Sequence, residues 1–245
     1  MASPFFRFKQ FTVWHDRCAM KVGTDGVLLG AWCPLMEFRS LEVEEGRKVL
    51  DIGTGSGLIA LMLAQRLPDA QITAIDIDNG AVEQANYNFQ QSPWAERLEC
   101  KQTALQNLVG EGIYDLIVSN PPYFQDSLKN PDNQRAMARH TDTLSYSELL
   151  AHSARLLTHN GTLALVLPIE AEQQIITIAQ THKLYPTHIT HVYPKPGKAA
   201  KRLLIAFSLL PIANSPSPIA NSLTLESATS PRSEEYKNIT QEFYL

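Results

Sequence analysis

The sequence has few cysteines, no long apolar run and no excess of basic charge, and each absence excludes a class of protein. Its 245 residues include three cysteines, and these form no CxxC pair. We therefore expect buried thiols in a reducing compartment rather than disulfides or a metal site. No apolar stretch approaches the ~20 residues that span a bilayer, and charged residues interrupt the N-terminus, so we expect no membrane span and no signal peptide. These features predict a cytoplasmic protein.

The charge balance is slightly acidic, with a formal net charge of −4 and an isoelectric point near 6.0. This balance argues weakly against a nucleic-acid partner. The basic residues are grouped, however, and two groups lie late in the chain. These groups are Arg139 with His140, and Lys195 with Lys198, Lys201 and Arg202. Each group alone is typical of a solvated face, and the fold decides whether they converge on one site.

Strand-like and helix-like segments alternate from residue 47 onward, which is typical of a parallel α/β sheet with right-handed crossovers. The predicted strands are 48–52, 71–75, 97–101, 114–119 and 162–167. The predicted helices are 58–66, 79–91, 145–157 and 170–181. Two closing strands, 188–193 and 203–209, have no helix between them, so we expect them to pair antiparallel.

We expect one core domain at 47–210, with additions on both sides. Residues 1–46 contain the apolar-rich stretch FFRFKQFTV and a loop leading into a helix, and they are expected to pack on the ligand crevice. The tract PIANSPSPIANS makes 211–231 a predicted flexible loop. Residues 232–245 are expected to dock back onto the domain. No exposed heptad or apolar stripe demands a partner, so we expect a monomer.

A glycine-rich loop, Asp51-Ile-Gly53-Thr-Gly55-Ser-Gly57, follows the first core strand and opens the first core helix. Glycines there allow a tight turn and let a ligand approach the backbone at a helix N-terminus. The next strand ends in Asp76, roughly 20 residues later, where a carboxylate accepts hydrogen bonds from ribose hydroxyls. In this strand–loop–helix context, the two features favour a nucleoside site over a structural turn.

The spacing of the glycines separates two classes of cofactor. A dinucleotide site reads G-x-G-x-x-G and holds a pyrophosphate, which the carboxylate of Asp51 would repel. The pattern D-x-G-x-G-x-G instead resembles the S-adenosylmethionine loop of the Rossmann-like methyltransferases, whose cofactor has an amino group that suits Asp51. The resemblance implies a seven-stranded, mostly parallel sheet with helices on both faces, and it implies that Asp76 holds the ribose. Where many family members have an acid for adenine, this chain has Lys101-Gln-Thr-Ala, so Gln102 and Thr103 are both candidates for that contact.

The end of the fourth strand, Asn120-Pro121-Pro122-Tyr123, resembles the [DNS]-P-P-[YFW] motif of methyltransferases that act on planar amino groups. Strand ends line the ligand crevice in this fold, so Asn120 is also expected beside the cofactor. The amide oxygen of Asn120 and the carbonyl of Pro121 would accept the two N–H hydrogens, which aims the delocalised lone pair at the methyl group. The prolines stiffen the backbone and Tyr123 stacks on a planar substrate, with no metal required. The alternative is a stiff structural turn.

Segments along nearly the whole chain are similar to one bacterial family, the methyltransferases that modify N6 of adenine 37, beside the anticodon, in tRNA1(Val). These segments are FRFKQFTVWHDRCAMKVGTDGVLLGAW, LDIGTGSGLIALMLAQR, NPPYF, ARH followed by LSYSELL, and SEEYKNITQEFYL. The resemblance implies a tRNA substrate whose adenine flips from a single-stranded loop into the pocket. In such an enzyme the basic groups above would face phosphates. Phe124 would wall the pocket or pack in the core, and Thr24 with Asp25 would reach the methionine end of the cofactor or cap a helix.

Three other functions fit parts of the pattern. A methyltransferase of the same fold could act on another RNA adenine or guanine, or on a protein glutamine. The glutamine methyltransferases of release factors usually have a separate helical domain, for which residues 1–46 are too short. A nicotinamide-dependent oxidoreductase is disfavoured by the loop spacing and by the absence of an evident Tyr-x-x-x-Lys. A non-catalytic RNA-binding module is disfavoured by the intact NPPY motif, although a fold alone never proves activity.

Overall fold

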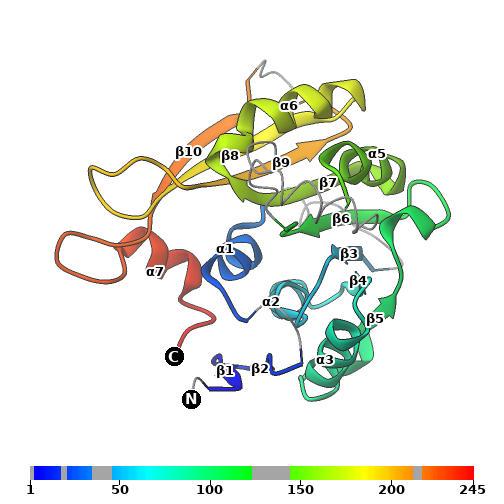
Figure 1. The fold of residues 1–245 in the computed structure, drawn as a ribbon, viewed down its shortest axis with the longest axis horizontal. Helices are drawn as coiled ribbons and strands as arrows, with labels where there is room; N and C mark the ends of the chain where they lie inside the picture. The colour runs from blue at the N-terminus through cyan, green and yellow to red at the C-terminus, as the bar shows by residue number, and fades with distance from the viewer. Residues whose placement is uncertain (1–2, 18–20, 35–45, 123–143, 212–216) are drawn as a thin grey trace, which may run out of the picture.

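The structure is a computed structural model that describes residues 3–17, 21–34, 46–122, 144–211 and 217–245. An eight-stranded sheet in the order β10-β8-β9-β7-β6-β3-β4-β5 forms its centre (Figure 1). The strands are β3 (Lys48–Ile52), β4 (Gln71–Asp76), β5 (Leu98–Gln102), β6 (Tyr114–Ser119), β7 (Leu157–Pro168), β8 (Tyr185–Tyr193), β9 (Arg202–Ser208) and β10 (Ile219–Thr224). All neighbours pair in parallel except β9, which is antiparallel to both β7 and β8. The predicted α/β class and the antiparallel closing strands are confirmed.

Helices cover both faces of this sheet (Figure 1). The helices α1 (Thr24–Trp32), α2 (Leu58–Arg66), α3 (Asn79–Gln90) and α7 (Glu234–Thr240) lie on one face, and α5 (Tyr146–Leu156) and α6 (Glu172–Thr181) lie on the other. Short 3-10 turns occur at Ala95–Arg97, Leu105–Asn107 and Ile169–Ala171. Val49 and Leu50 are adjacent and fully buried, yet they belong to different core clusters. Side chains alternate along a strand, so a sheet covered on both faces needs apolar residues at every position.

The sheet has one strand more than the seven expected. Strand β10 lies within 211–231, which was expected to be a flexible loop, and pairs in parallel with β8 so that Ile219 faces His188. Its first four residues are exposed, and Leu223 is the residue of β10 that packs in the core. The strand therefore depends on backbone pairing at the sheet edge, which a polar Pro/Ser/Asn composition does not signal. The expectation of seven strands and of a loop over the whole of 211–231 is corrected.

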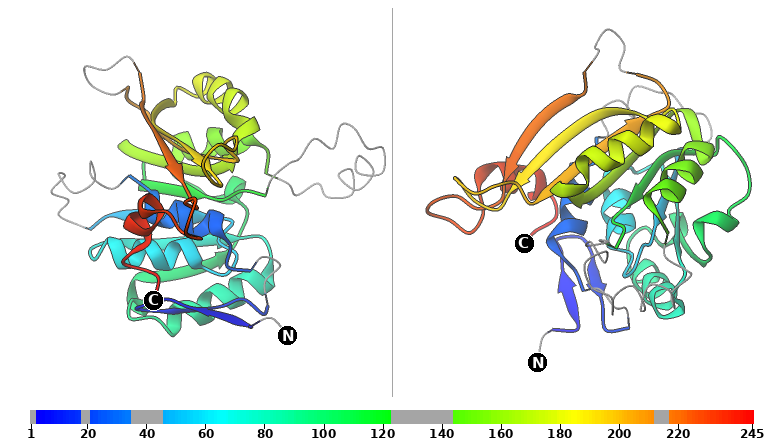
Figure 2. Two further views of the ribbon diagram at one scale, coloured as in Figure 1. Left: turned by 90° about the vertical axis from the view of Figure 1, so that its left-hand side faces the viewer. Right: turned by 45° about the horizontal axis from the view of Figure 1, so that its top comes forward.

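The chain ends pack together outside the main sheet. Strands β1 (Phe5–Arg7) and β2 (Thr12–Trp14) form an antiparallel hairpin (blue in Figure 2) that contacts α3. At three residues each, these strands are too short for an alternating pattern to be recognised in the sequence. The amide of Lys9, in the hairpin turn, donates to the carbonyl of Phe243 at 2.8 Å, and the Phe243 side chain is buried.

Candidate functional site

The cleft lies at the edge of the sheet where its parallel strands end. Strands β3, β4 and β6 lead there into the glycine loop, Asp76 and Asn120, while the antiparallel β9 begins there with Arg202. This arrangement gathers residues from distant parts of the chain around one cavity of about 320 Å³. The cavity is lined by Lys21, Gly23, Thr24, Asp25, Gly26, Gly53, Thr54, Gly55, Ser56, Leu58, Ile59, Asn120 and Arg202.

The glycine loop presents open backbone to the cleft. Gly53, Gly55 and Gly57 have φ angles of 68°, 55° and 80°, a region that side chains disfavour. A Cβ atom added at Gly53 or Gly55 would meet no atom within 4 Å, whereas one at Gly57 would lie 2.5 Å from the ring of Phe89. Gly57 therefore lets α2 pack closely on α3, and the other two leave a backbone cradle that a ligand can approach.

Asp51 lies beneath the loop rather than on the cleft wall. Its side chain is fully buried, and one oxygen accepts hydrogen bonds from the Thr54 hydroxyl at 2.6 Å and the Ala60 amide at 3.2 Å. The other oxygen has no hydrogen-bond partner in the described part of the chain. Burial raises the pKa of the Asp51 carboxyl to about 7, with Asp76 adding to the rise and the two hydrogen bonds opposing it. The sequence predicted contact with a cofactor amino group, but the structure buries this carboxyl beneath the loop and Asp51 does not line the cavity.

Asp76 joins the glycine loop to the end of β4. One carboxylate oxygen accepts from the Gly55 amide at 2.9 Å, and the other accepts from the Asp78 amide at 3.0 Å. The side chain is half-buried, so it keeps acceptor capacity toward solvent. It does not line the cavity named above, although its partner Gly55 does. The predicted ribose acceptor thus stands at the rim of the loop.

The strand ends beside Asp76 supply the candidates for an adenine contact. Thr103 donates its amide to the Asp76 carbonyl at 3.0 Å, and the Gln102 side-chain amide donates to the Ile77 carbonyl at 3.2 Å. The Ile77 side chain is 53% exposed, although it follows a buried strand. Ile77 was not among the candidates from the sequence, and its exposed position directly after Asp76 makes it a further candidate for the adenine contact.

The strand that carries the NPPY motif is fixed to its neighbour at the cleft. Ser119, the last residue of β6, is buried and its hydroxyl donates to the Ile52 carbonyl at 2.9 Å. Asn120 then lines the cleft, Pro121 is buried and Pro122 is exposed. Four other predicted residues of the substrate side lie outside the described residues, namely Tyr123, Phe124, Arg139 and His140.

Two predicted site residues from opposite ends of the chain form an ion pair at the cleft. The Nε of Arg202 donates to both carboxylate oxygens of Asp25, at 3.0 and 2.9 Å. Helix α1 begins at Thr24, its N-cap is Gly23, and no side chain caps it. Neither Thr24 nor Asp25 therefore serves as the cap. The pair places α1 against the start of β9, and its partners are 177 residues apart, so no local pattern signals it.

The predicted lysine group lies on the turn between β8 and β9, at the same edge of the sheet. The turn is closed by the Lys198 amide, which donates to the Lys195 carbonyl at 3.2 Å, and by the Lys201 amide, which donates to the Val192 carbonyl at 2.9 Å. All three lysines are exposed, and none lines the cavity. Lys21, from the N-terminal part of the chain, does line it.

Neither a metal-binding cluster nor a reactive thiol is found among the described residues. No group of three or more His, Cys, Asp or Glu side chains there is placed to hold a metal ion. Cys33 and Cys100 are free and buried, and burial raises the pKa of each thiol to about 12, which suppresses its nucleophilic form. None of the described helices is long and apolar enough to cross a membrane.

Comparison with known proteins identifies the family. The family model for the methyltransferase small domain matches residues 35–181. The chain is 50% identical over 246 residues to the tRNA1(Val) (adenine(37)-N6)-methyltransferase of Bacteroides thetaiotaomicron, and 52% identical over 247 residues to that of Parabacteroides distasonis. Each match covers 100% of this chain and 99% of the relative.

A solved structure supports the same fold. A crystal structure described as a predicted O-methyltransferase from Agrobacterium tumefaciens superposes with a TM-score of 0.66 at 17% identity, covering 89% of this chain and 96% of that one. At this identity the likeness concerns the fold alone. The glycine loop and Asn120 share one cleft, and the family model and the full-length relatives show that the chain belongs to the S-adenosylmethionine-dependent tRNA1(Val) (adenine(37)-N6)-methyltransferase family.

Proposed function

We propose that this protein transfers a methyl group from S-adenosylmethionine to the N6 amino group of adenine 37 in tRNA1(Val). Full-length relatives that carry this name support the substrate. The observation that carries the chemistry is that Asn120 and the glycine loop line one cleft. A methyl donor on the loop and an amino group at Asn120 would therefore meet in the same cavity.

The residues around the glycine loop fit S-adenosylmethionine, which supplies an electrophilic methyl group when it is bound. Gly53 and Gly55 leave open backbone where the ligand would approach. Asp76 at the rim would accept from the ribose hydroxyls, and the unpartnered oxygen of Asp51 would favour the amino group from beneath the loop. Thr24 and Asp25 complete the wall at the methionine end. Gly57 would support the cofactor site indirectly, because it lets α2 pack closely against α3.

Asn120 and Pro121 orient the adenine amino group. Its nitrogen is a weak nucleophile because its lone pair is delocalised into the ring. The Asn120 amide oxygen and the Pro121 carbonyl each accept one N–H, which favours a pyramidal nitrogen with its lone pair directed across the cleft. The buried Pro121 and the bond from Ser119 to Ile52 keep these two acceptors in place. Pro122 stiffens the turn that follows, Tyr123 stacks on the flipped base and Phe124 walls the pocket.

The tRNA backbone would contact the basic groups around the cleft. Arg139 and His140 follow the NPPY motif, and Lys195, Lys198 and Lys201 stand exposed at the same edge of the sheet. Arg202 differs from the lysines because it pairs with Asp25 at the cleft wall. The carboxylate offsets its positive charge, so Arg202 would attract phosphate less strongly. Phosphate contacts of this kind make binding steeply dependent on salt. The protein acts as a monomer in the cytoplasm, where the tRNA is found.

The function is tested with an unmodified tRNA1(Val) transcript and S-adenosylmethionine, followed by nucleoside mass spectrometry. We expect N6-methyladenosine at position 37, and no product from a transcript in which guanine replaces that adenine. Total RNA and total protein are offered in parallel. Methylation of another RNA position, or of protein glutamine alone, would overturn the substrate while leaving the reaction class in place.

A further inference from the structure

The β1–β2 hairpin has two faces of different chemistry. Phe5 is paired with Trp14 and Arg7 with Thr12, so these four side chains lie on one face. Val13 points to the other face and is fully buried in the core. That face packs the hairpin onto the core. The outer face nevertheless carries two aromatic rings, and Phe5 is 38% exposed.

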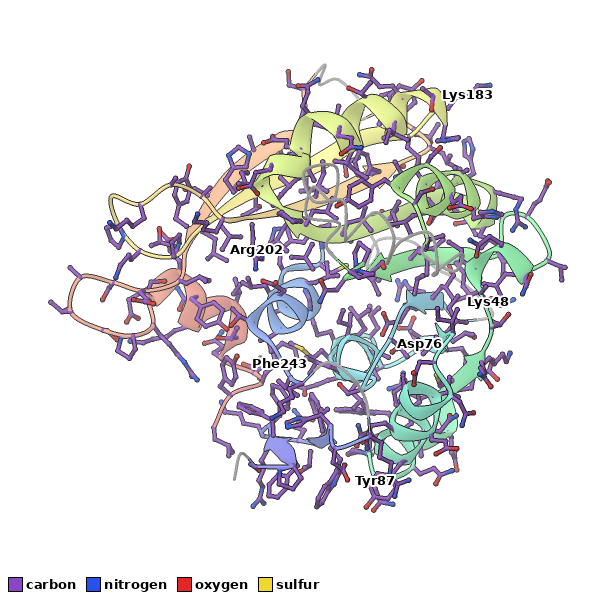
Figure 3. All side chains as sticks on the ribbon, viewed as in Figure 1. Lys48, Asp76, Tyr87, Lys183, Arg202 and Phe243 are labelled. Carbon is purple, nitrogen blue, oxygen red and sulfur yellow. The ribbon has the colours of Figure 1, made fainter. Side chains whose placement is uncertain are left out.

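The outer face continues as a row of rings onto helix α3. The ring centroids of Phe5 and Trp14 are 4.9 Å apart, and those of Trp14 and Tyr87 are 6.3 Å apart. The guanidinium carbon of Arg17 lies 6.0 Å from the Tyr87 ring centre, and Tyr87 is 39% exposed. Figure 3 shows Tyr87 on the lower side of α3, beside the hairpin. We call Phe5, Arg7, Trp14, Arg17 and Tyr87 together the hairpin platform.

Two buried amide side chains of α3 hold the platform in position. Asn88 accepts from the Trp14 amide at 2.9 Å, and its own amide group donates to the carbonyls of Trp14 and Ser56 at 2.8 Å. Gln84 accepts from the Arg17 amide at 2.9 Å. Ser56 belongs to the glycine loop and lines the cleft. The platform is therefore fixed relative to the cleft, and little ordering is required when a partner binds.

The charge of this segment is opposite to that of the whole chain. Residues 3–17 contain three basic residues and one acidic residue in a protein of net charge −4. Neither Arg7 nor Arg17 takes part in the ion pairs found among the described residues. A few residues further along the chain, Lys21 lines the cleft itself. Exposed rings beside unpaired guanidinium groups match the chemistry of unpaired bases and phosphates in RNA.

We propose that the hairpin platform is a tRNA contact surface outside the target base. Phe5, Trp14 and Tyr87 stack on unpaired nucleotides, and Arg7 and Arg17 contact phosphates. The inference rests on the proposed tRNA substrate and adds to it a second contact, separate from the pocket for adenine 37.

The test compares a platform variant, Phe5→Ala with Arg17→Ala and Tyr87→Ala, with a control of Tyr185→Ala and Lys48→Ala. Tyr185 is as exposed as Tyr87 but begins β8, and Lys48 begins β3, both at the opposite edge of the sheet from the cleft. Trp14 is kept because its backbone is tied to α3. We expect the platform variant to bind tRNA1(Val) about tenfold or more weaker in a filter assay, and the control to stay within about twofold of wild type. Arg17→Ala alone should reduce the salt slope of binding by about 1.

Folding is checked by the thermal shift that S-adenosylhomocysteine produces, which the platform variant should retain. Unchanged tRNA affinity in a variant that keeps this shift would overturn the inference. Ultraviolet crosslinking of the wild-type protein to tRNA needs no variant: crosslinks in 3–17 or α3 support the platform, and crosslinks confined to other segments overturn it. Methyl transfer is measured on the same wild-type preparation. If tRNA binding depends on the platform but no methylation occurs, the proposed function is contradicted and the tRNA contact surface is supported.

Discussion

The two sides of the cleft are built in different ways. The cofactor side comes from one continuous segment, residues 51–76, in which Asp51 and Asp76 hold the glycine loop by hydrogen bonds. The opposite side is assembled from Asn120, which follows β6, and Arg202, which begins β9. Substitutions on the cofactor side should therefore weaken cofactor binding. Substitutions on the opposite side should slow methyl transfer and leave cofactor binding intact.

The largest expected effect is on the second side, at Asn120. Asn120→Ala removes one acceptor for the amino group, and misplacing a reacting group costs about 100-fold in rate or more. We expect that loss in single-turnover methyl transfer, with S-adenosylhomocysteine affinity within about twofold of wild type. Asn107→Ala serves as the control, because Asn107 is exposed and does not line the cleft. A rate within about threefold of wild type would remove Asn120 from the mechanism.

The next effect is on the cofactor side, at Asp76. Asp76→Ala removes the acceptor for the Gly55 and Asp78 amides and for the proposed ribose contact. Hydrogen bonds to a charged group are worth ~1.5–3 kcal/mol, so calorimetry should show S-adenosylhomocysteine binding about 10- to 100-fold weaker. Asp76→Asn keeps one acceptor oxygen, so its affinity should lie between those of wild type and Asp76→Ala. Equal S-adenosylhomocysteine affinity in all three proteins would show that Asp76 does not contribute to cofactor binding.

Asp51 should make the stability of the folded protein depend on pH. Its pKa is about 7 in the folded protein and near 3.8 when unfolded, so the folded state binds more protons between these values. The contribution of Asp51 to wild-type stability should therefore fall as pH rises from about 4 to about 7, and level off above that. Asp51→Asn lacks this titration, and any cost of its new amide group does not vary with pH. The melting temperature of the variant minus that of wild type should increase by several degrees between pH 5 and pH 7. A constant difference would contradict the raised pKa.

The smallest effect concerns the ion pair of Asp25 and Arg202. The two side chains are 33% and 21% exposed, so solvent still limits the contribution of the pair, and surface pairs are worth ~0–1 kcal/mol. A double-mutant cycle with Asp25→Ala and Arg202→Ala should give a coupling between about 1.5-fold and about fivefold in methyl-transfer efficiency. Strictly additive effects would mean that the two residues act separately, Asp25 on the cofactor and Arg202 on the tRNA.

The strand, loop and helix of the cofactor side could be predicted from the sequence because they are local. A strand, three glycines and a following acid fall within a short segment, and backbone geometry explains each of them. Gly57 illustrates the limit, since its contact with Phe89 depends on how two helices pack. The parallel core strands were equally predictable, because burial on both faces demands continuous apolar runs.

The other features depend on contacts between distant residues. Arg202 was expected to face phosphate, and its contact with Asp25 across 177 residues has no local signal. Strand β10 was hidden by its polar composition, and the hairpin strands by their three-residue length. Ile77 is a candidate for the adenine contact because its side chain is exposed next to Asp76, and the sequence does not show that exposure.

The central claim is that this cleft methylates adenine 37 of tRNA1(Val) through Asn120. The most direct measurement is nucleoside mass spectrometry of tRNA1(Val) from cells that lack the gene, complemented with the wild-type protein or with Asn120→Ala. We predict that N6-methyladenosine at position 37 is lost in the deletion strain, returns with the wild-type protein and stays absent with the variant. Persistence of the modification in the deletion strain, or its full return with Asn120→Ala, would contradict the claim.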